Sequence, residues 1–274
     1  MKTLTFTLLI LLVSVTTVFS QIVISPYVVM VDQKNQYGTF LVSNQTTETQ
    51  EVSIFFKFGY PASDNQGNVT MLYSDSSNIN MQNDLTDMVK AFPKKFTLKP
   101  GEKQTVRMTV KPDKNMKDGT YWTRIVTSSQ SKQTITDTST SLSAAINFVL
   151  NQVTTVIYKN KRYENKVDLK DITAETDEEF LNINVPVEVN GDYPFFAGTS
   201  VKIYDASGSL VTEQTQYFTV YYGMTKRNSF RLSELKAGEY KAEVTITSDN
   251  NPDIPISDKP LAAPITKTIS FSIN

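Results

Sequence analysis

The sequence predicts an all-β protein made of two β-sandwiches in tandem, and three observations support this prediction. Apolar and polar residues alternate with a period of two in many short runs, helical periodicity is almost absent, and Gly, Pro, Asn and Asp separate the runs. Such alternation is typical of strands that bury one face, and the separating residues favour turns. The pattern is interrupted once, by the polar and basic stretch Lys159 to Lys166, which suits a linker.

The first half carries about seven strands in about 140 residues, a density typical of an immunoglobulin-like sandwich. The segment Gln104 to Val110 illustrates the alternation, because Val106 and Met108 lie on one face of the strand and Arg107 on the other. Pro100 and Gly101 form the turn before this strand. The predicted strands are Ile22 to Asp32, Tyr37 to Ser43, Glu51 to Gly59, Lys95 to Leu98, Gln104 to Val110, Gly119 to Thr127 and Ser143 to Tyr158.

One helix is predicted, in the long connection between Tyr60 and Phe92. Asn83 can cap a turn whose apolar residues recur at helical spacing: Leu85, Met88, Val89 and Phe92. We interpret this segment as a lid on one end of the sandwich.

The second half is predicted to form another sandwich. Its clearest strand is Phe180 to Val189, which contains Pro186; because proline cannot donate to a ladder, we expect this strand to be an edge or to be bulged. Val201 to Asp205 and Ser209 to Thr212 flank a hairpin turn, and the remaining predicted strands are Glu239 to Thr247 and Ile265 to Ile273. The predicted domains are thus 21–160 and 161–274, two immunoglobulin-like sandwiches after a signal peptide.

Residues 1–20 have the features of an export signal. Lys2 gives a basic start, an apolar run from Leu8 to Val13 follows, and Val18 and Ser20 suit a signal-peptidase site. A membrane anchor is disfavoured because polar residues interrupt the apolar stretch, which is shorter than the roughly 20 residues of a span. No cysteine is available for a lipid anchor. We therefore expect a periplasmic protein, with secretion as the other option.

Composition excludes many activities. The 274 residues include no cysteine and no histidine, which excludes thiol nucleophiles, disulfides, His-paired triads and Cys or His metal sites. The formal net charge of -1 provides no global field for nucleic acid. We expect no cofactor, no metal and no enzymatic activity; a hydrolase that uses carboxylates or an oxygen-ligated metal stays open as an alternative.

The most informative segment is the long predicted strand Ser143 to Tyr158. Ile146, Phe148 and Leu150 point one way along it, with Asn147 and Asn151 on the other face. Residues 146–158 would span about 40 Å, which is longer than a sandwich strand needs. An exposed apolar edge can pair with another chain. Periodicity alone favours a last strand that is fully paired within its own sheet.

These residues resemble a family. Across about Ile22 to Tyr158, the chain resembles the N-terminal domain of the PapD-like periplasmic pilus-assembly chaperones. The matching segments are ISPYVVMVD, LVSNQT, FPKKFTLKPGEKQTVRMTV, DGTYWTRI and the closing INFVLNQVTTVIYKN. The resemblance implies a two-domain chaperone that binds a pilin-like exported subunit by donor-strand complementation, with Ile146, Phe148 and Leu150 as the donor residues.

The chain departs from the family at one feature. The resemblance implies that an arginine on the first strand and a lysine late in the donor strand hold the carboxyl terminus of the subunit. Val28 and Thr155 occupy those positions here, and neither is a cation. Three cations of the linker, Lys159, Lys161 and Arg162, are the candidate substitutes, although solvated surface charges are the favoured interpretation of all three. A structural or adhesive envelope protein without chaperone activity is therefore the alternative function.

Overall fold

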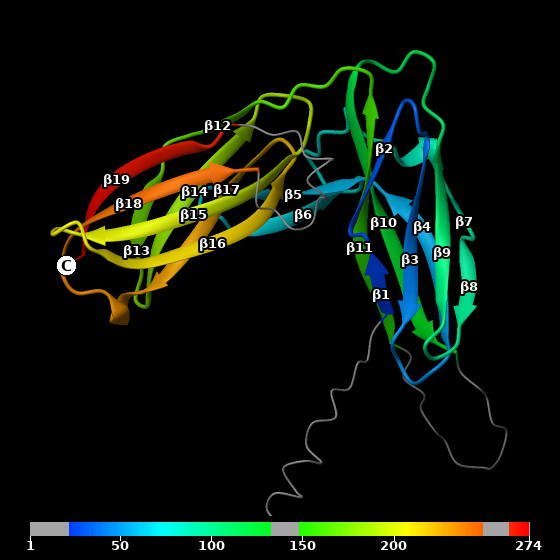
Figure 1. The fold of residues 1–274 in the computed structure, drawn as a ribbon, viewed down its shortest axis with the longest axis horizontal. Helices are drawn as coiled ribbons and strands as arrows, with labels where there is room; N and C mark the ends of the chain where they lie inside the picture. Colours follow the sequence, from blue (N-terminus) through cyan, green and yellow to red (C-terminus); the bar gives the residue numbers. More distant parts are fainter. Residues whose placement is uncertain (1–21, 133–147, 249–262, 274) are drawn as a thin grey trace, which may run out of the picture.

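The computed structural model describes residues 22–132, 148–248 and 263–273, and strands dominate all three segments (Figure 1). The predicted signal peptide and Ile146 lie outside the described residues. Four sheets of four or five strands pair into two sandwiches, and one extra hairpin lies beside them. The prediction of an all-β, two-sandwich, immunoglobulin-like fold is confirmed.

The first sandwich contains a four-stranded and a five-stranded sheet. Alternate residues of each strand form its core; in β9, for example, Val106, Met108 and Val110 are fully buried, while the residues between them are exposed. The four-stranded sheet has the order β1 (Ile22–Ser25), β3 (Tyr37–Asn44), β9 (Lys103–Val110), β7 (Val89–Phe92), and the five-stranded sheet the order β2 (Val28–Asp32), β11 (Val149–Asn160), β10 (Gly119–Ser131), β4 (Gln50–Lys57), β8 (Lys95–Leu98).

The first predicted strand is divided between the two sheets of this sandwich. The chain leaves β1 in one sheet, passes through Pro26 and Tyr27, and enters β2 in the other sheet. There β2 runs parallel to β11, with Val28 opposite Thr155. The last strand of the domain therefore acquires a parallel neighbour only where β2 begins.

The helix predicted between Asn83 and Phe92 is wrong. The segment forms a single 3-10 turn, Thr86–Met88, followed by β7, in which Val89 and Ala91 are buried and Phe92 is exposed. Pairing of β7 with β9 imposes a period of two, so tertiary pairing overrides the helical spacing of the apolar residues. Asn83 caps no helix; its Nδ2 donates to the carbonyl oxygen of Thr120 (2.7 Å).

The second sandwich also has two sheets. One sheet is centred on β14 (Phe180–Val189), flanked on one side by β12 (Val167–Leu169) and β13 (Thr173–Thr176) and on the other by β17 (Gly223–Arg231). The other sheet has the order β16 (Leu210–Val220), β15 (Phe195–Asp205), β18 (Gly238–Thr247), β19 (Ile265–Ile273). A 3-10 turn, Leu232–Glu234, follows β17.

The prediction that Pro186 marks an edge or bulged strand is wrong, because β14 is the central strand and keeps a regular register with β17. Pro186 lies opposite Thr225, whose backbone N–H points away to Ser63. The backbone nitrogen of Pro186, which carries no hydrogen, consequently faces away from β17, toward the break between β12 and β13. The proline is tolerated because no ladder hydrogen bond is needed at that position.

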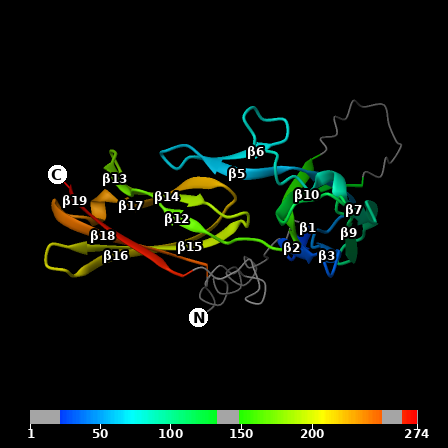
Figure 2. The same ribbon diagram turned by 90° about the horizontal axis from the view of Figure 1, so that it is seen from above.

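A hairpin of β5 (Gly59–Ser63) and β6 (Val69–Tyr73) leaves the first sandwich and extends along the second (Figure 2). The Thr225 N–H donates to Ser63 Oγ (2.7 Å), and Arg227 Nε donates to the Gln66 carbonyl oxygen. Gly67, at φ +77°, packs against Arg227 in the turn of the hairpin. The hairpin covers the free edge of β17 and links the two sandwiches.

An apolar cluster, mostly aromatic, fills the contact between the sandwiches. The first sandwich and its hairpin contribute Phe58, Tyr60, Trp122 and Ile157, and the second sandwich contributes Tyr193, Phe196 and Tyr221. We call these seven residues the interdomain cluster. Trp122, the only tryptophan of the chain, is 1% exposed and lies 4.7 Å from the Tyr221 ring.

Two glycines test the hairpin contact. Gly67 and Gly101 share a φ of +77°, but a Cβ at Gly67 would lie 2.9 Å from the Arg227 backbone nitrogen, whereas a Cβ at Gly101 would meet nothing within 4 Å. We expect Gly101→Ala to lower the free energy of unfolding by about 1 kcal/mol through backbone strain alone. Gly67→Ala should lower the free energy of unfolding, measured by urea denaturation, distinctly more than Gly101→Ala does. Equal losses would show that the hairpin does not press on β17.

Candidate functional site

The candidate site begins at strand β11, whose two edges are paired unequally. One edge pairs with β10 along the whole strand, from Val149 to Asn160. The other edge pairs with β2 only from Thr155 to Lys159. Residues 149–154 thus have no second neighbour strand among the residues that the structure describes. Their outward N–H and C=O groups form an open edge of about 20 Å, at about 3.3 Å per residue.

The open half of β11 presents an apolar face. Phe148 is 82% exposed and Leu150 46%, on the same strand face as Val156 and Tyr158, which are fully buried in the first core. The apolar face of the core therefore continues past the end of the sandwich into solvent. Exposed apolar side chains beside unpaired backbone groups are the features of a strand that pairs with another chain.

The outer face of the five-stranded sheet places one cation at the end of the open edge. Arg124 of β10 lies opposite Lys57 of β4 on one side and Thr155 of β11 on the other, and Thr155 in turn lies opposite Val28. Val28 and Thr155 are therefore direct neighbours on this face. The adjacent strand supplies an arginine to the same row.

Arg124 is a nearly buried guanidinium with neutral partners. It is 9% exposed; its Nε donates to the Gly59 carbonyl oxygen (2.9 Å) and its Nη1 to Thr155 Oγ1. Within the described segments no carboxylate lies within ion-pair distance of it. A buried cation without an anion is energetically costly. The neighbouring Lys57, by contrast, is neutralised by Asp75 (2.9 Å).

The second sandwich closes over Arg124. The guanidinium carbon lies 4.9 Å from the centre of the Tyr221 ring, which follows β16 and belongs to the interdomain cluster. The next residue, Tyr222, donates its hydroxyl to Asn83 Oδ1 (2.8 Å), and burial raises the pKa of that hydroxyl, so it stays a donor. Of these two tyrosines, only Tyr221 contacts Arg124, so the site combines Tyr221 of the second sandwich with residues of the first.

The structure separates the linker cations from the open edge. Lys159 is four residues beyond Thr155, about 13 Å along the strand, and its Nζ lies 5.8 Å from the Tyr163 ring. Ile157, between them on the same strand face, is buried in the interdomain cluster. Arg162 follows β11 and is exposed. Arg124 was missed from the sequence, although it is the only basic residue of its strand; recognising its role requires the register of β10 against β11.

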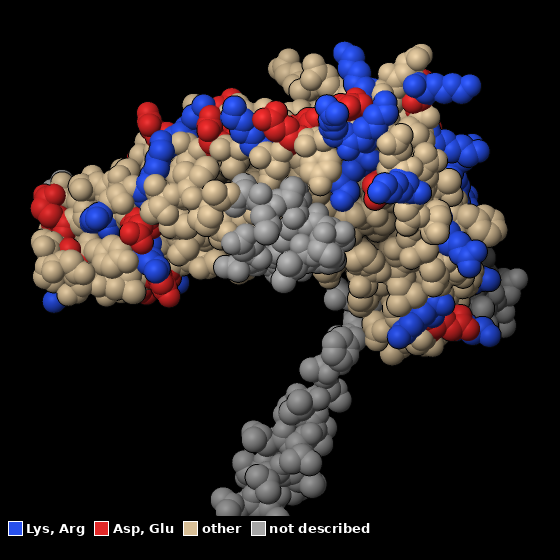
Figure 3. All heavy atoms as spheres, turned by 45° about the horizontal axis from the view of Figure 1, so that its top comes forward, with Lys and Arg blue, Asp and Glu red and all other residues tan. Residues whose placement is uncertain are grey.

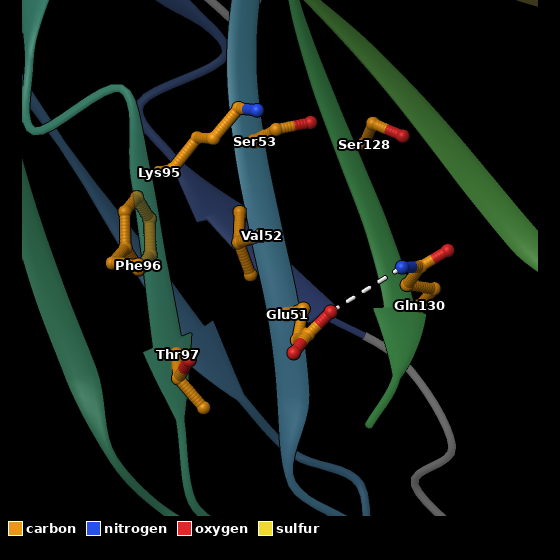
Figure 4. Close-up of a pocket in the computed structure, with 8 residues that line it drawn as sticks. All are labelled: Glu51, Val52, Ser53, Lys95, Phe96, Thr97, Ser128 and Gln130. Atoms are coloured by element: carbon orange, nitrogen blue, oxygen red, sulfur yellow. Dashed lines mark hydrogen bonds between the residues drawn. The ribbon is translucent and has the colours of Figure 1, made fainter. Parts of the chain in front are cut away.

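A shallow hollow of about 490 Å³ lies on the same sheet, away from Arg124 (Figure 4). It is formed by residues of β4, β8 and β10: Glu51, Val52, Ser53, Lys95, Phe96, Thr97, Ser128 and Gln130. The Gln130 Nε2 to Glu51 contact across it is long, at 3.4 Å, and both residues are exposed. We interpret the hollow as a surface feature of a twisted sheet.

The molecular surface carries both signs of charge. Figure 3 shows Lys and Arg gathered where the sandwiches meet and over the first sandwich, with Asp and Glu interspersed along the second. A mixed surface of this kind creates no extended field of one sign. Among the described residues, no three Asp or Glu side chains gather into a metal-binding group. No helix within the described segments is long and apolar enough to cross a membrane.

Comparison with known proteins finds similarity in structure only. No protein-family model and no curated protein matches the chain. The YadV chaperone shares 10% identity and a TM-score of 0.46, over 91% of this chain and 99% of that chain. A chain of the Salmonella enterica SafA pilin–SafB chaperone complex shares 11% identity and a TM-score of 0.45, over 93% and 99%. The E. coli chaperone DraB shares 10% identity and a TM-score of 0.44, over 93% of this chain and 98% of that chain. This similarity concerns the fold alone.

The position of Trp122 makes the interdomain cluster observable. Replacing Tyr221 by Ala removes the ring nearest the indole, so we expect water to reach Trp122 and its fluorescence emission to shift to longer wavelength. Tyr222→Phe keeps the packing and loses one hydrogen bond, typically worth about 1 kcal/mol, so its emission should match the wild type. A spectrum of Tyr221→Ala unchanged from the wild type would contradict this account of the domain contact.

Proposed function

We propose that this protein is an exported, non-enzymatic chaperone-like protein that binds a pilin-like or other exported polypeptide by β-strand addition along β11. The observation that carries the proposal is the open half of β11, where exposed Phe148 and Leu150 lie beside unpaired backbone groups. Backbone groups provide affinity in this mode of binding, and alternate side chains provide specificity. Ile146, Phe148 and Leu150 are the proposed donor residues.

The partner strand is proposed to run parallel to β11 and to end at Arg124. The unpaired guanidinium lies beside Thr155, at the carboxyl end of the open edge. The Thr155 N–H is already bonded to the Tyr27 carbonyl oxygen (3.0 Å), so a partner ladder cannot continue past it. A strand that stops there can place its terminal carboxylate against Arg124, and a charge-assisted pair offsets the cost of burying the cation.

The remaining sequence predictions fit this proposal. We place an export signal in residues 1–20, the domain boundary between Asn160 and Lys161, and the mature chain in the periplasm. The end of β11 at Asn160 and the start of the second sandwich at Val167 support that boundary.

The alternative, a structural or adhesive envelope protein, is favoured by one observation: Val28 and Thr155 replace the two cations expected from the family resemblance. Arg124 weakens this alternative, because the same row still holds a cation. Lys159 and Arg162 are retained only as the weaker anchor candidates, since neither lies beside the open edge.

Replacing Phe148 by Asp tests the donor strand. Phe148 is mostly exposed, so the free energy of unfolding should change by no more than about 0.5 kcal/mol. In a complex, the same aspartate would be buried without a partner, so capture should be lost. The measurement is mass spectrometry of what co-purifies from the native envelope under mild conditions.

The control for this experiment is Tyr37→Asp, which places the same charge on an exposed aromatic position of β3 in the other sheet. We expect a pilin-like subunit with the wild type and with Tyr37→Asp, and none with Phe148→Asp. Partners that are the same in all three samples would eliminate the donor strand and favour the envelope-protein alternative.

Arg124→Gln tests the carboxylate anchor. The probe is a synthetic library of alternating apolar and polar peptides, prepared once with free carboxyl ends and once amidated. Truncating one member of a buried charge pair costs at least about 2 kcal/mol, so free-acid affinity should fall roughly 30-fold or more while amide affinity changes little. Lys57→Gln, at the Asp75-paired neighbour, should leave both affinities unchanged. If wild type binds acid and amide equally, Arg124 is not an anchor.

A further inference from the structure

We propose that Tyr221 of the second sandwich positions Arg124 for the partner carboxylate, so that the anchor is complete only when the two sandwiches are in contact. This inference rests on the proposed function and assigns a role in it to the second domain. Its basis is one juxtaposition: a nearly buried guanidinium of the first sandwich lies against the face of a nearly buried ring of the second.

Different domains contact the edge and the face of the guanidinium: the first sandwich accepts its hydrogen bonds at the edge, and the second sandwich places a ring against its face. Gly59 and Thr155 accept from Nε and Nη1, which occupies two of the five N–H groups. Rotation out of this plane is opposed by the Tyr221 ring, 4.9 Å from Cζ. None of the described residues accepts a hydrogen bond from the remaining N–H groups, which leaves them available to a carboxylate. Because the guanidinium is a planar fork, fixing its plane also fixes the direction of those groups.

The ring is itself rigidly supported. Tyr221 is 4% exposed, and it contacts Trp122 at 4.7 Å and Tyr60 at 6.3 Å between ring centres. Both of these aromatics come from the first sandwich and its hairpin. Cation–π attraction is stronger where water is excluded, as it is here. The ring therefore couples the conformation of Arg124 to the contact between the domains.

Tyr222 provides a matched control beside the interdomain cluster, against which its ring packs. The ring lies 4.8 Å from Tyr60 and 5.5 Å from Trp122, so its removal also deletes aromatic contacts between the sandwiches while Tyr221 keeps its place against Arg124. Arg124 makes its cation–π contact with Tyr221, not with Tyr222. A merely structural role would affect the two tyrosines alike, whereas a positioning role singles out Tyr221.

The test compares free-acid and amidated versions of the same alternating peptide library on Tyr221→Leu, Tyr221→Phe and Tyr222→Leu. The readout is the ratio of acid to amide affinity, which a general loss of stability does not change. We expect Tyr221→Leu to lower this ratio roughly tenfold, which lies between the effects of an exposed and of a desolvated cation–π contact. Tyr221→Phe retains the ring face and should keep the ratio within about twofold, and Tyr222→Leu should leave it unchanged.

A second measurement covers the case in which Tyr221→Leu does not fold. In the NMR spectrum of the wild type, the Arg124 Nε–H should be protected from exchange and shifted by the ring current, and free-acid but not amidated peptides should move it. An Arg124 Nε–H that exchanges freely, or a Tyr221→Leu ratio equal to the wild-type ratio, overturns the inference. A wild-type ratio of one overturns the proposed carboxylate anchor itself, and the inference with it.

Discussion

The unequal pairing of β11 is the constraint on which the rest of the molecule depends. Its carboxyl half is fixed from both sides by β10 and β2, and from both faces by the first core and the interdomain cluster. Its amino half pairs only with β10 among the residues that the structure describes. A site works best when rigid elements hold it, and here the buried half of one strand fixes the geometry of the exposed half. The free edge is therefore preorganised as well as open.

The sequence predicted those features that depend on local periodicity. Alternation located β9 and β18 and placed Leu150 on the same strand face as Phe148, because a period of two can be recognised within a single strand. Features set by pairing between distant strands could not be predicted. The spacing of Leu85, Met88 and Val89 indicated a helix until β9 imposed a strand on the segment. Arg124 became a site residue only through the register that places it opposite Thr155.

The register also explains how the site can lack both cations expected from the family resemblance and still hold a positive charge. Lysine or arginine at Val28 or Thr155 would present a charge directly at the edge of the sheet. Arg124 belongs to β10, the next strand toward the centre of the sheet, and its side chain reaches Thr155 from that side. Thr155 lacks a charge but still contributes to the site, because its hydroxyl accepts a hydrogen bond from the guanidinium and orients it. A cation at that position would repel Arg124 instead.

In the proposed binding mode, the inward position of the charge changes which ligands the site would select. An exposed cation attracts many anions weakly, since water screens it. Arg124 is nearly buried among neutral groups. A ligand of the proposed kind would therefore gain from it only by placing a carboxylate at the end of the open edge, where the Thr155 N–H is bonded to the Tyr27 carbonyl oxygen. A chain that pairs along the open edge but continues past this point gains no such contact and meets β2. The same arrangement thus favours strand ends over strand interiors, and discrimination comes from desolvation and geometry more than from net charge.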